Sequence, residues 1–105
     1  MTANKLFYQL LSNAPHHKRR RLITAAENNI IKAIAEAAYN LLYGTVSLSR
    51  TKLQQFSSYK QILRLLSLRS VPISRKRVLI QSQRGSSLLS LLLPILIQHE
   101  GQKGT

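Results

Sequence analysis

The chain has 105 residues, which is enough for one small domain with one modest hydrophobic core. Its 16 lysines and arginines outnumber three acidic residues, so the formal charge is +13 at pH 7, and the absence of cysteine excludes disulfides and thiolate metal sites. Because 44% of the residues are hydrophobic, a purely disordered basic tail is excluded as well.

The N-terminal quarter predicts two short helices in succession. Apolar residues recur at helical spacing over residues 3–12, which indicates an amphipathic helix. The Asn-Ala-Pro sequence at 13–15 ends it. A concentrated basic block, HHKRRR at 16–21, follows and leads into apolar residues. We expect this block to form the first turns of a second helix that reaches Ala26.

The clearest helix of the chain is predicted in the stretch NNIIKAIAEAAYNLLYG, which starts at Asn28. Its isoleucines, leucines and several alanines share one broad face, whereas Lys32 and Glu36 lie on the other, four residues apart and able to pair weakly. Asn28 or Asn29 is expected to cap its start. Gly44 is expected to end it, because glycine adopts the left-handed backbone conformation at little cost.

Two shorter helices are predicted next. Ser49 is expected to cap a helix over residues 50–56. Ser57 or Ser58 is expected to cap the following one, SSYKQILRLLSLRS, in which apolar residues share one face and cations are turned away.

The last third predicts a basic helix followed by an apolar one. Ser74 is expected to cap the basic helix and Gly85 to end it. The stretch SSLLSLLLPILIQ at 86–98 is the final helix, and Pro94 is expected to bend or interrupt it. Residues 99–105 are expected to form a disordered tail.

These segments predict an all-α fold, a small bundle of about five short helices with an apolar C-terminal helix. We expect residues 1–15 to form a loosely attached N-terminal helix and residues 16–98 a basic helical domain. No signal peptide is apparent. The longest apolar run, at 88–97, is about half of the roughly 20 residues that a helix needs to span a bilayer.

The charge balance predicts a polyanionic partner. Three acids cannot neutralise 16 cations, so the surplus repels itself unless nucleic acid or an anionic membrane surface compensates it. Without a recognisable recognition helix or zinc finger, binding to the phosphate backbone of nucleic acid, without reading its sequence, is the stronger interpretation. A solvated cationic face, or a nuclear import signal at 16–21, is the alternative. The candidate nucleic-acid-binding residues are Lys18, Arg19, Arg20, Arg21, Arg50, Lys52, Lys60, Arg64, Arg69, Arg75, Lys76, Arg77 and Arg84.

One short pattern occurs twice. VSLSRTKL at 46–53 and VPISRKRV at 71–78 both place a serine cap before cations in a first helical turn, between two apolar residues. Cations are unfavourable at a helix start, and a bound phosphate would relieve the conflict. Chance recurrence of common residues is the competing explanation. The tyrosines and phenylalanines are better explained as core residues than as platforms for base stacking.

The sequence offers few candidate catalytic residues. No Ser/His/Asp arrangement, phosphate-binding glycine motif or set of metal ligands is recognisable. We therefore expect no enzymatic activity, no cofactor and no metal ion.

The apolar C-terminal segment allows two interpretations. Its leucines can be buried against the chain's own core, another copy or another protein, or they can lie in the interface of an anionic membrane beside flanking cations. Burial in protein is favoured. The residues considered for membrane or partner contact are Leu88, Leu89, Leu92, Leu93 and Leu96.

The order of these features resembles a group of small basic proteins encoded by Maverick/Polinton elements and by adintovirus-like relatives of adenoviruses. The stretch NLLYGTVSL at 40–48 matches their helix ending N-x-L-x-G-x-V-x-L. The stretch VPISRKRVLIQ at 71–81 matches their motif V-[SP]-[LI]-x-[KR]-[KR]-[KR]-x-L-x-Q. The apolar end opens with Gly85-Ser86 where those proteins have two glycines, and Gln54 and Gln55 replace further cations of their basic helix.

This resemblance implies a virion core protein that condenses DNA, located in the virion and the host nucleus. It also implies maturation by a viral protease near Gly85. A membrane-active minor virion protein and a capsid-associated interaction protein are the alternative functions.

Overall fold

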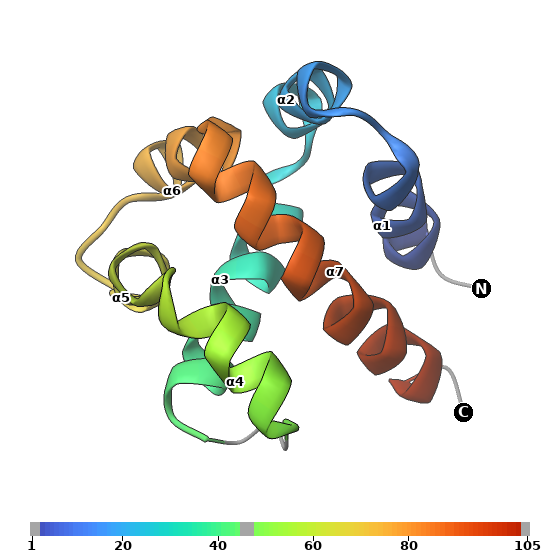
Figure 1. Cartoon of the computed structure of the whole chain (residues 1–105). Helices are drawn as coiled ribbons and strands as arrows, with labels where there is room; N and C mark the ends of the chain where they lie inside the picture. The colour runs from blue at the N-terminus through green and yellow to red at the C-terminus, as the bar shows by residue number, and fades with distance from the viewer. Residues whose placement is uncertain (1–2, 45–47, 104–105) are drawn as a thin grey trace.

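The computed structural model describes the backbone of residues 3–44 and 48–103 and the side chains of residues 4–44 and 48–98. Within these ranges the fold is entirely helical and contains no strand (Figure 1), which confirms the all-α class. The expected number of about five helices is wrong, because the described residues form seven: α1 (Ala3–Asn13), α2 (His16–Ala25), α3 (Asn28–Leu42), α4 (Arg50–Ser57), α5 (Lys60–Ser67), α6 (Ile73–Gln81) and α7 (Gln83–Lys103). Two residues separate α4 from α5, and Ser82 alone separates α6 from α7.

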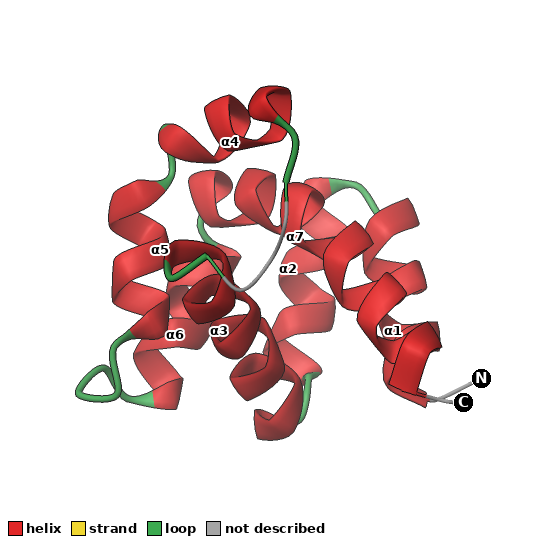
Figure 2. Ribbon diagram, turned by 90° about the horizontal axis from the view of Figure 1, so that it is seen from below, coloured by secondary structure: helices red, strands yellow, loops and turns green. Residues whose placement is uncertain are grey.

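The core lies where α3 and α7 meet. Helix α3 packs against α5, and α7 packs against α1 and α6, so that α3 and α7 are covered by their neighbours (Figures 1 and 2). Ile31 and Ile34 of α3 and Leu92 and Leu93 of α7 are almost completely buried. Burial of such a side chain contributes roughly 1.5–3 kcal/mol, so this α3–α7 centre supplies most of the favourable burial.

Local signals at the ends of α3 and α4 were predicted correctly. Gly44 follows α3 with φ of +75°, a left-handed conformation that confirms it as the C-terminal stop. The Ser49 hydroxyl accepts a hydrogen bond from the Lys52 amide at 3.3 Å, which confirms it as the cap of α4.

Other predicted caps are wrong. Glu27 precedes α3 and Tyr59 precedes α5, and neither side chain makes a capping hydrogen bond, so Asn28, Asn29, Ser57 and Ser58 do not act as the predicted caps. Ser57 and Ser58 instead donate hydrogen bonds to carbonyls in the last turn of α4.

The predicted cap of the basic helix at Ser74 is wrong as well. Helix α6 starts at Ile73, after Pro72 in an extended conformation, and not after Ser74. Proline is well suited to such a place because its fixed φ and missing amide cost nothing there.

Gly85 does not end a helix but lies inside α7. Ser82 ends α6 and also caps α7, since its hydroxyl accepts from the Gly85 amide at 3.0 Å and donates to the Leu79 carbonyl at 2.6 Å. A Cβ atom at Gly85 would lie 1.8 Å from the Leu79 carbonyl oxygen, so glycine is required for the close approach of α6 and α7. Helix α7 also continues through Pro94, and the final helix is therefore long instead of short.

The domain division at residues 15 and 98 stays a prediction. Tyr8 and Leu11 of α1 are fully buried and belong to the same core cluster as α3 and α7. At the other end, α7 is helical to Lys103 and so overlaps the predicted tail.

Candidate nucleic-acid interface

The structure separates the 13 candidate cations into internal and external ones. Arg19 and Lys76 are buried, and the guanidinium groups of Arg77 and Arg84 are engaged with other parts of the chain. Arg84 is exposed nonetheless. The remaining nine are exposed, and their side chains make no hydrogen bond with another described residue: Lys18, Arg20, Arg21, Arg50, Lys52, Lys60, Arg64, Arg69 and Arg75.

Arg19 joins α1, α2 and α7. Its Nε donates to the Leu11 carbonyl at 2.8 Å and its Nη1 donates to the Ser86 carbonyl at 2.9 Å and to the Ser90 hydroxyl. Leu11 lies in the last turn of α1, where carbonyls have no amide partner within the helix and carry partial negative charge, and the Ala14 amide after the helix also donates to the Leu11 carbonyl, at 3.2 Å. Burial lowers the pKa of Arg19 below its usual value, yet arginine stays protonated in proteins. The role of Arg19 is therefore structural, and its buried guanidinium group does not face the candidate interface.

Arg77 and Arg84 act at the ends of two other helices. Arg77 donates through Nη1 to the carbonyls of Ile23 and Ala26, each at 2.6 Å, where α2 ends. Arg84 donates to the carbonyl of Ser58, the residue that follows α4, and its guanidinium carbon lies 5.3 Å from the centre of the Tyr59 ring. Three arginines thus complete the C-terminal ends of three preceding helices.

Lys76 is the second buried cation, beside Arg19. Its side chain lies in the interior of the bundle on α6 and makes no hydrogen bond with another described residue. Removal from water lowers the pKa of Lys76 from its usual value of 10.5. It is not part of an exposed interface.

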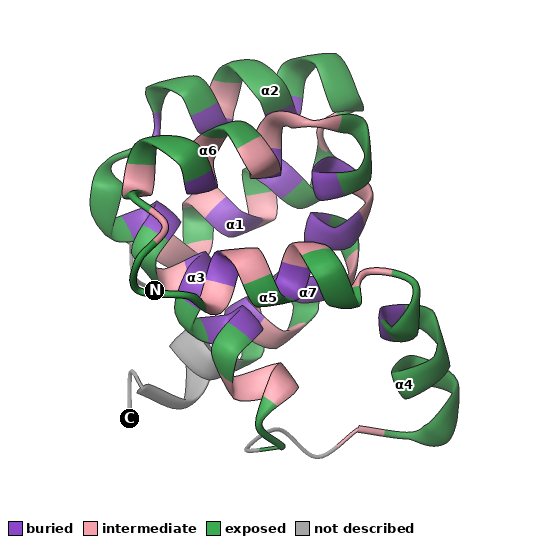
Figure 3. Ribbon diagram, turned by 90° about the vertical axis from the view of Figure 1, so that its left-hand side faces the viewer, coloured by how far each residue is buried: buried purple, intermediate pink, exposed green. Residues whose placement is uncertain are grey.

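Seven of the nine exposed cations form two groups. Helix α2, which carries one group, is at one end of the molecule, and α4, which carries part of the other, is at the opposite end (Figures 1 and 3). The cations of α5, Lys60 and Arg64, are consecutive in the chain with those of α4. We call Lys18, Arg20 and Arg21 the α2 group, and Arg50, Lys52, Lys60 and Arg64 the α4–α5 group. Arg69 and Arg75 lie in and just after the connection between α5 and α6.

A polar hollow of about 350 Å³ adjoins the α2 group. Helices α2 and α6 pack side by side, and Gln81 Nε2 donates to the Thr24 hydroxyl at 2.6 Å (Figure 3). On α7, Ser86 is joined to His16 by a hydrogen bond of 2.6 Å between Oγ and Nδ1. The hollow between these contacts is lined by His16, His17, Arg20, Gln81, Gln83 and Ser86.

This lining is rich in hydrogen-bond donors and contains no acid. Helices α2 and α7 both begin at it, with His16 and Gln83, so partial positive charge adds to that of Arg20. The sequence analysis missed the histidines and glutamines of this hollow as candidates. The basic block pointed to the histidines, but only the packing of α2 against α6 and α7 brings the glutamines to them.

The five leucines considered for membrane or partner contact are buried in the chain's own core, each at most 6% exposed. Leu88 and Leu93 of α7, for example, belong to the buried core cluster. In the described part of the chain, no helix combines the length and hydrophobicity needed to cross a bilayer.

The aromatic residues are only partly in the core. Tyr8 and Phe56 are buried, as predicted. For Tyr39 and Tyr43 the prediction is wrong, because both side chains are about half exposed or more; their ring centres lie 4.6 Å apart at the C-terminal end of α3, with Tyr39 in its last turn and Tyr43 directly after it. Their spacing of four residues places them as neighbours on the helix surface.

Comparisons of the chain with models of protein families, with curated proteins and with solved structures found no match.

Proposed function

We propose that the protein binds nucleic acid through the phosphate backbone, without reading sequence and without catalysing a reaction. The observation that carries this proposal is the set of nine exposed candidate cations on a chain with a net charge of +13. The polar hollow beside Arg20 is the proposed seat of a phosphate group, because its lining offers donors and no competing carboxylate.

The size of the molecule agrees with a coating or condensing role. Its longest dimension is 33 Å. Duplex DNA of that length carries about 20 phosphate charges, at one per roughly 1.7 Å. A chain of charge +13 would neutralise about two thirds of them. A virion core protein that packages double-stranded DNA, in a virus or virus-derived element that replicates in the host nucleus, is the specific form of this proposal.

The membrane-active alternative is less well supported. The leucines that would enter a bilayer form the core, so the bundle would have to open before they could reach lipid. The capsid-associated alternative does not require such a change.

The test measures binding of a short labelled duplex to the full chain by fluorescence anisotropy over a salt series. If six to ten phosphates are contacted, the affinity falls by about 10³ to 10⁵ between 50 and 200 mM salt. A scrambled duplex sequence should bind equally well. Absence of binding at 50 mM salt, or binding that does not depend on salt, would contradict the proposal.

Two triple variants with the same net charge then locate the interface. One replaces Lys18, Arg20 and Arg21 by glutamine, and the other replaces Arg50, Lys52 and Lys60 by glutamine. All six side chains are exposed, so both variants should fold. The measured quantity is the slope of the logarithm of the binding constant against the logarithm of the salt concentration. We expect this slope to fall by about one unit for each phosphate contact that the α2 variant loses, and to fall by less in the α4–α5 variant. Equal losses would mean that net charge alone acts and that the hollow has no special role.

A further inference from the structure

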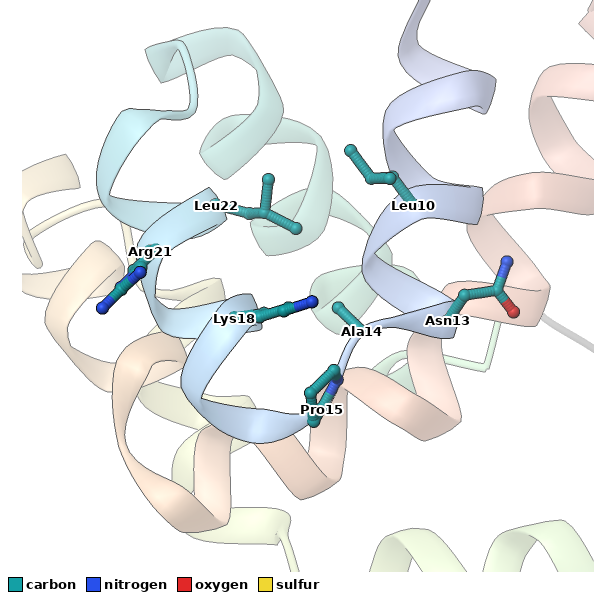
Figure 4. A pocket seen from close by; sticks show the side chains of 7 residues that line it. All are labelled: Leu10, Asn13, Ala14, Pro15, Lys18, Arg21 and Leu22. Carbon is teal, nitrogen blue, oxygen red and sulfur yellow. The ribbon is translucent and has the colours of Figure 1, made fainter.

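A second hollow, between α1 and α2, differs in character from the polar one. It has a volume of about 430 Å³, and its walls are mostly apolar: Leu10, Ala14, Pro15 and Leu22 (Figure 4). Figure 4 shows Leu10 and Leu22 pointing into the space from the two helices, with Lys18 extending across it toward Ala14. Arg21 also lines it, from α2. We call this hollow the α1–α2 groove.

The groove continues onto an exposed apolar surface. Leu10 is 55% exposed, and Leu6, one helical turn earlier on α1, is equally exposed. Neither Lys18 nor Arg21 makes a hydrogen bond with another described residue, so both cations are free to bind an anion at the edge of an apolar surface.

We propose that the α1–α2 groove binds an acidic amphipathic helix of a partner protein. An apolar side chain of the partner would fill the space between Leu10 and Leu22, and carboxylates three or four residues away would pair with Lys18 and Arg21. This mode is a helix laid into a groove, in which apolar anchors supply affinity and rim charges supply orientation.

Charge and polarity select this occupant over the others. A nucleic-acid backbone presents phosphates and sugars, which gain nothing from the leucine walls of the groove. A second copy of this chain has only three acidic residues in 105 and a net charge of +13, so it cannot supply the complementary carboxylates. A protein partner with an acidic surface is drawn in by the same charge that repels a copy.

The experiment uses the full chain and a fluorescein-labelled helical peptide that carries two leucines four residues apart with glutamates beside them. Two control peptides separate the contributions: one with serine in place of the leucines, and one with glutamine in place of the glutamates. We expect the parent peptide to bind and both controls to bind about tenfold more weakly or worse, as measured by anisotropy.

The matched protein variants are Leu10→Ser and Leu53→Ser. Leu53 lies on α4 and is also 55% exposed, so both changes remove the same side chain from an equally exposed position. We expect Leu10→Ser to weaken peptide binding about tenfold and Leu53→Ser to leave it unchanged. The variant Lys18→Glu tests what the cationic edge contributes to peptide binding, and Lys32→Glu on α3 is its control. This test does not depend on any effect that substituting Leu10 has on folding.

Duplex binding distinguishes this proposal from the nucleic-acid one, because Leu10→Ser removes no charge and should leave the affinity for DNA unchanged. The proposed groove would be overturned if Leu10→Ser did not weaken peptide binding. It would also be overturned if the serine-containing peptide bound as well as the parent peptide. A wild-type dimer in sedimentation equilibrium that Leu10→Ser dissociates would overturn the acidic partner in favour of a second copy.

Discussion

At the scale of single residues, three arginine side chains find backbone carbonyls as partners in a chain that has few acidic side chains to offer. Arg19, Arg77 and Arg84 bind carbonyls at the ends of α1, α2 and α4. Such carbonyls have no partner within their own helix and carry the negative end of the helix dipole. They therefore take the place of carboxylates, and arginine suits them because its planar fork donates to several oxygens at once.

Replacing Arg19 by methionine tests this role. The substitution removes the charged donor of Arg19 from the buried carbonyls of Leu11 and Ser86, and the loss of a hydrogen bond to a charged group costs about 1.5–3 kcal/mol. We expect a loss of at least about 2 kcal/mol in the free energy of unfolding, measured by urea denaturation at fixed salt. The neighbouring substitution Arg20→Met removes the same charge from an exposed side chain and should change stability by about 0.5 kcal/mol or less. Equal midpoints for the two variants would contradict the structural assignment.

At the scale of helices, α4 differs from the other six. Among the described elements it is the one without an extensive packing contact to another helix, and Figure 3 shows it standing away from the bundle. Its attachments are the buried ring of Phe56 and the bond from Arg84 to the carbonyl of Ser58. Segments with few buried contacts open locally at low cost, so α4 should be the least stable helix within the described range.

Amide hydrogen exchange checks this expectation. We expect the amides of α4 to exchange at least about tenfold faster than those in the middle of α3, which corresponds to about 1.4 kcal/mol less local stability. Phe56→Ala should accelerate exchange in α4 further while leaving α3 nearly unchanged. Protection of α4 equal to that of α3 would show that the helix opens only with the whole bundle.

At the scale of the whole molecule, the surplus charge opposes folding. At 10 mM ionic strength the screening length is about 30 Å, nearly the 33 Å length of the molecule, so every cation repels every other. At 150 mM it is about 8 Å, and only near neighbours interact. The repulsion that destabilises the compact state should therefore weaken as salt is added.

Thermal unfolding in increasing sodium chloride measures this effect. We expect Tm to rise between 10 and 150 mM salt, and each 1 kcal/mol of relief should add roughly 4–8 °C for a domain of this size. Affinity for duplex DNA should fall over the same range, because the same ions compete with phosphate. The triple variant of the α2 group should show a smaller rise in Tm. A Tm independent of salt would mean that repulsion contributes little.

The sequence by itself determined the features that depend on neighbours along the chain. Helical periodicity established the all-α class, and residue chemistry at single positions located the stop at Gly44 and the cap at Ser49. These signals are local, because a helix and its ends are built from hydrogen bonds within about four residues. The total charge was equally evident, since it needs no structure at all.

Only the tertiary structure decided which cations face inward and which hollows exist. Arg19 and Arg20 are adjacent and look alike in the sequence, yet one completes the end of α1 and the other faces solvent. Gly85 looked like a helix stop, but it is the point where α6 and α7 approach. In each case the deciding partner is a carbonyl of another helix, Leu11 for Arg19 and Leu79 for Gly85, which lies beyond the four-residue reach of helix hydrogen bonds, so local propensity does not determine the contact.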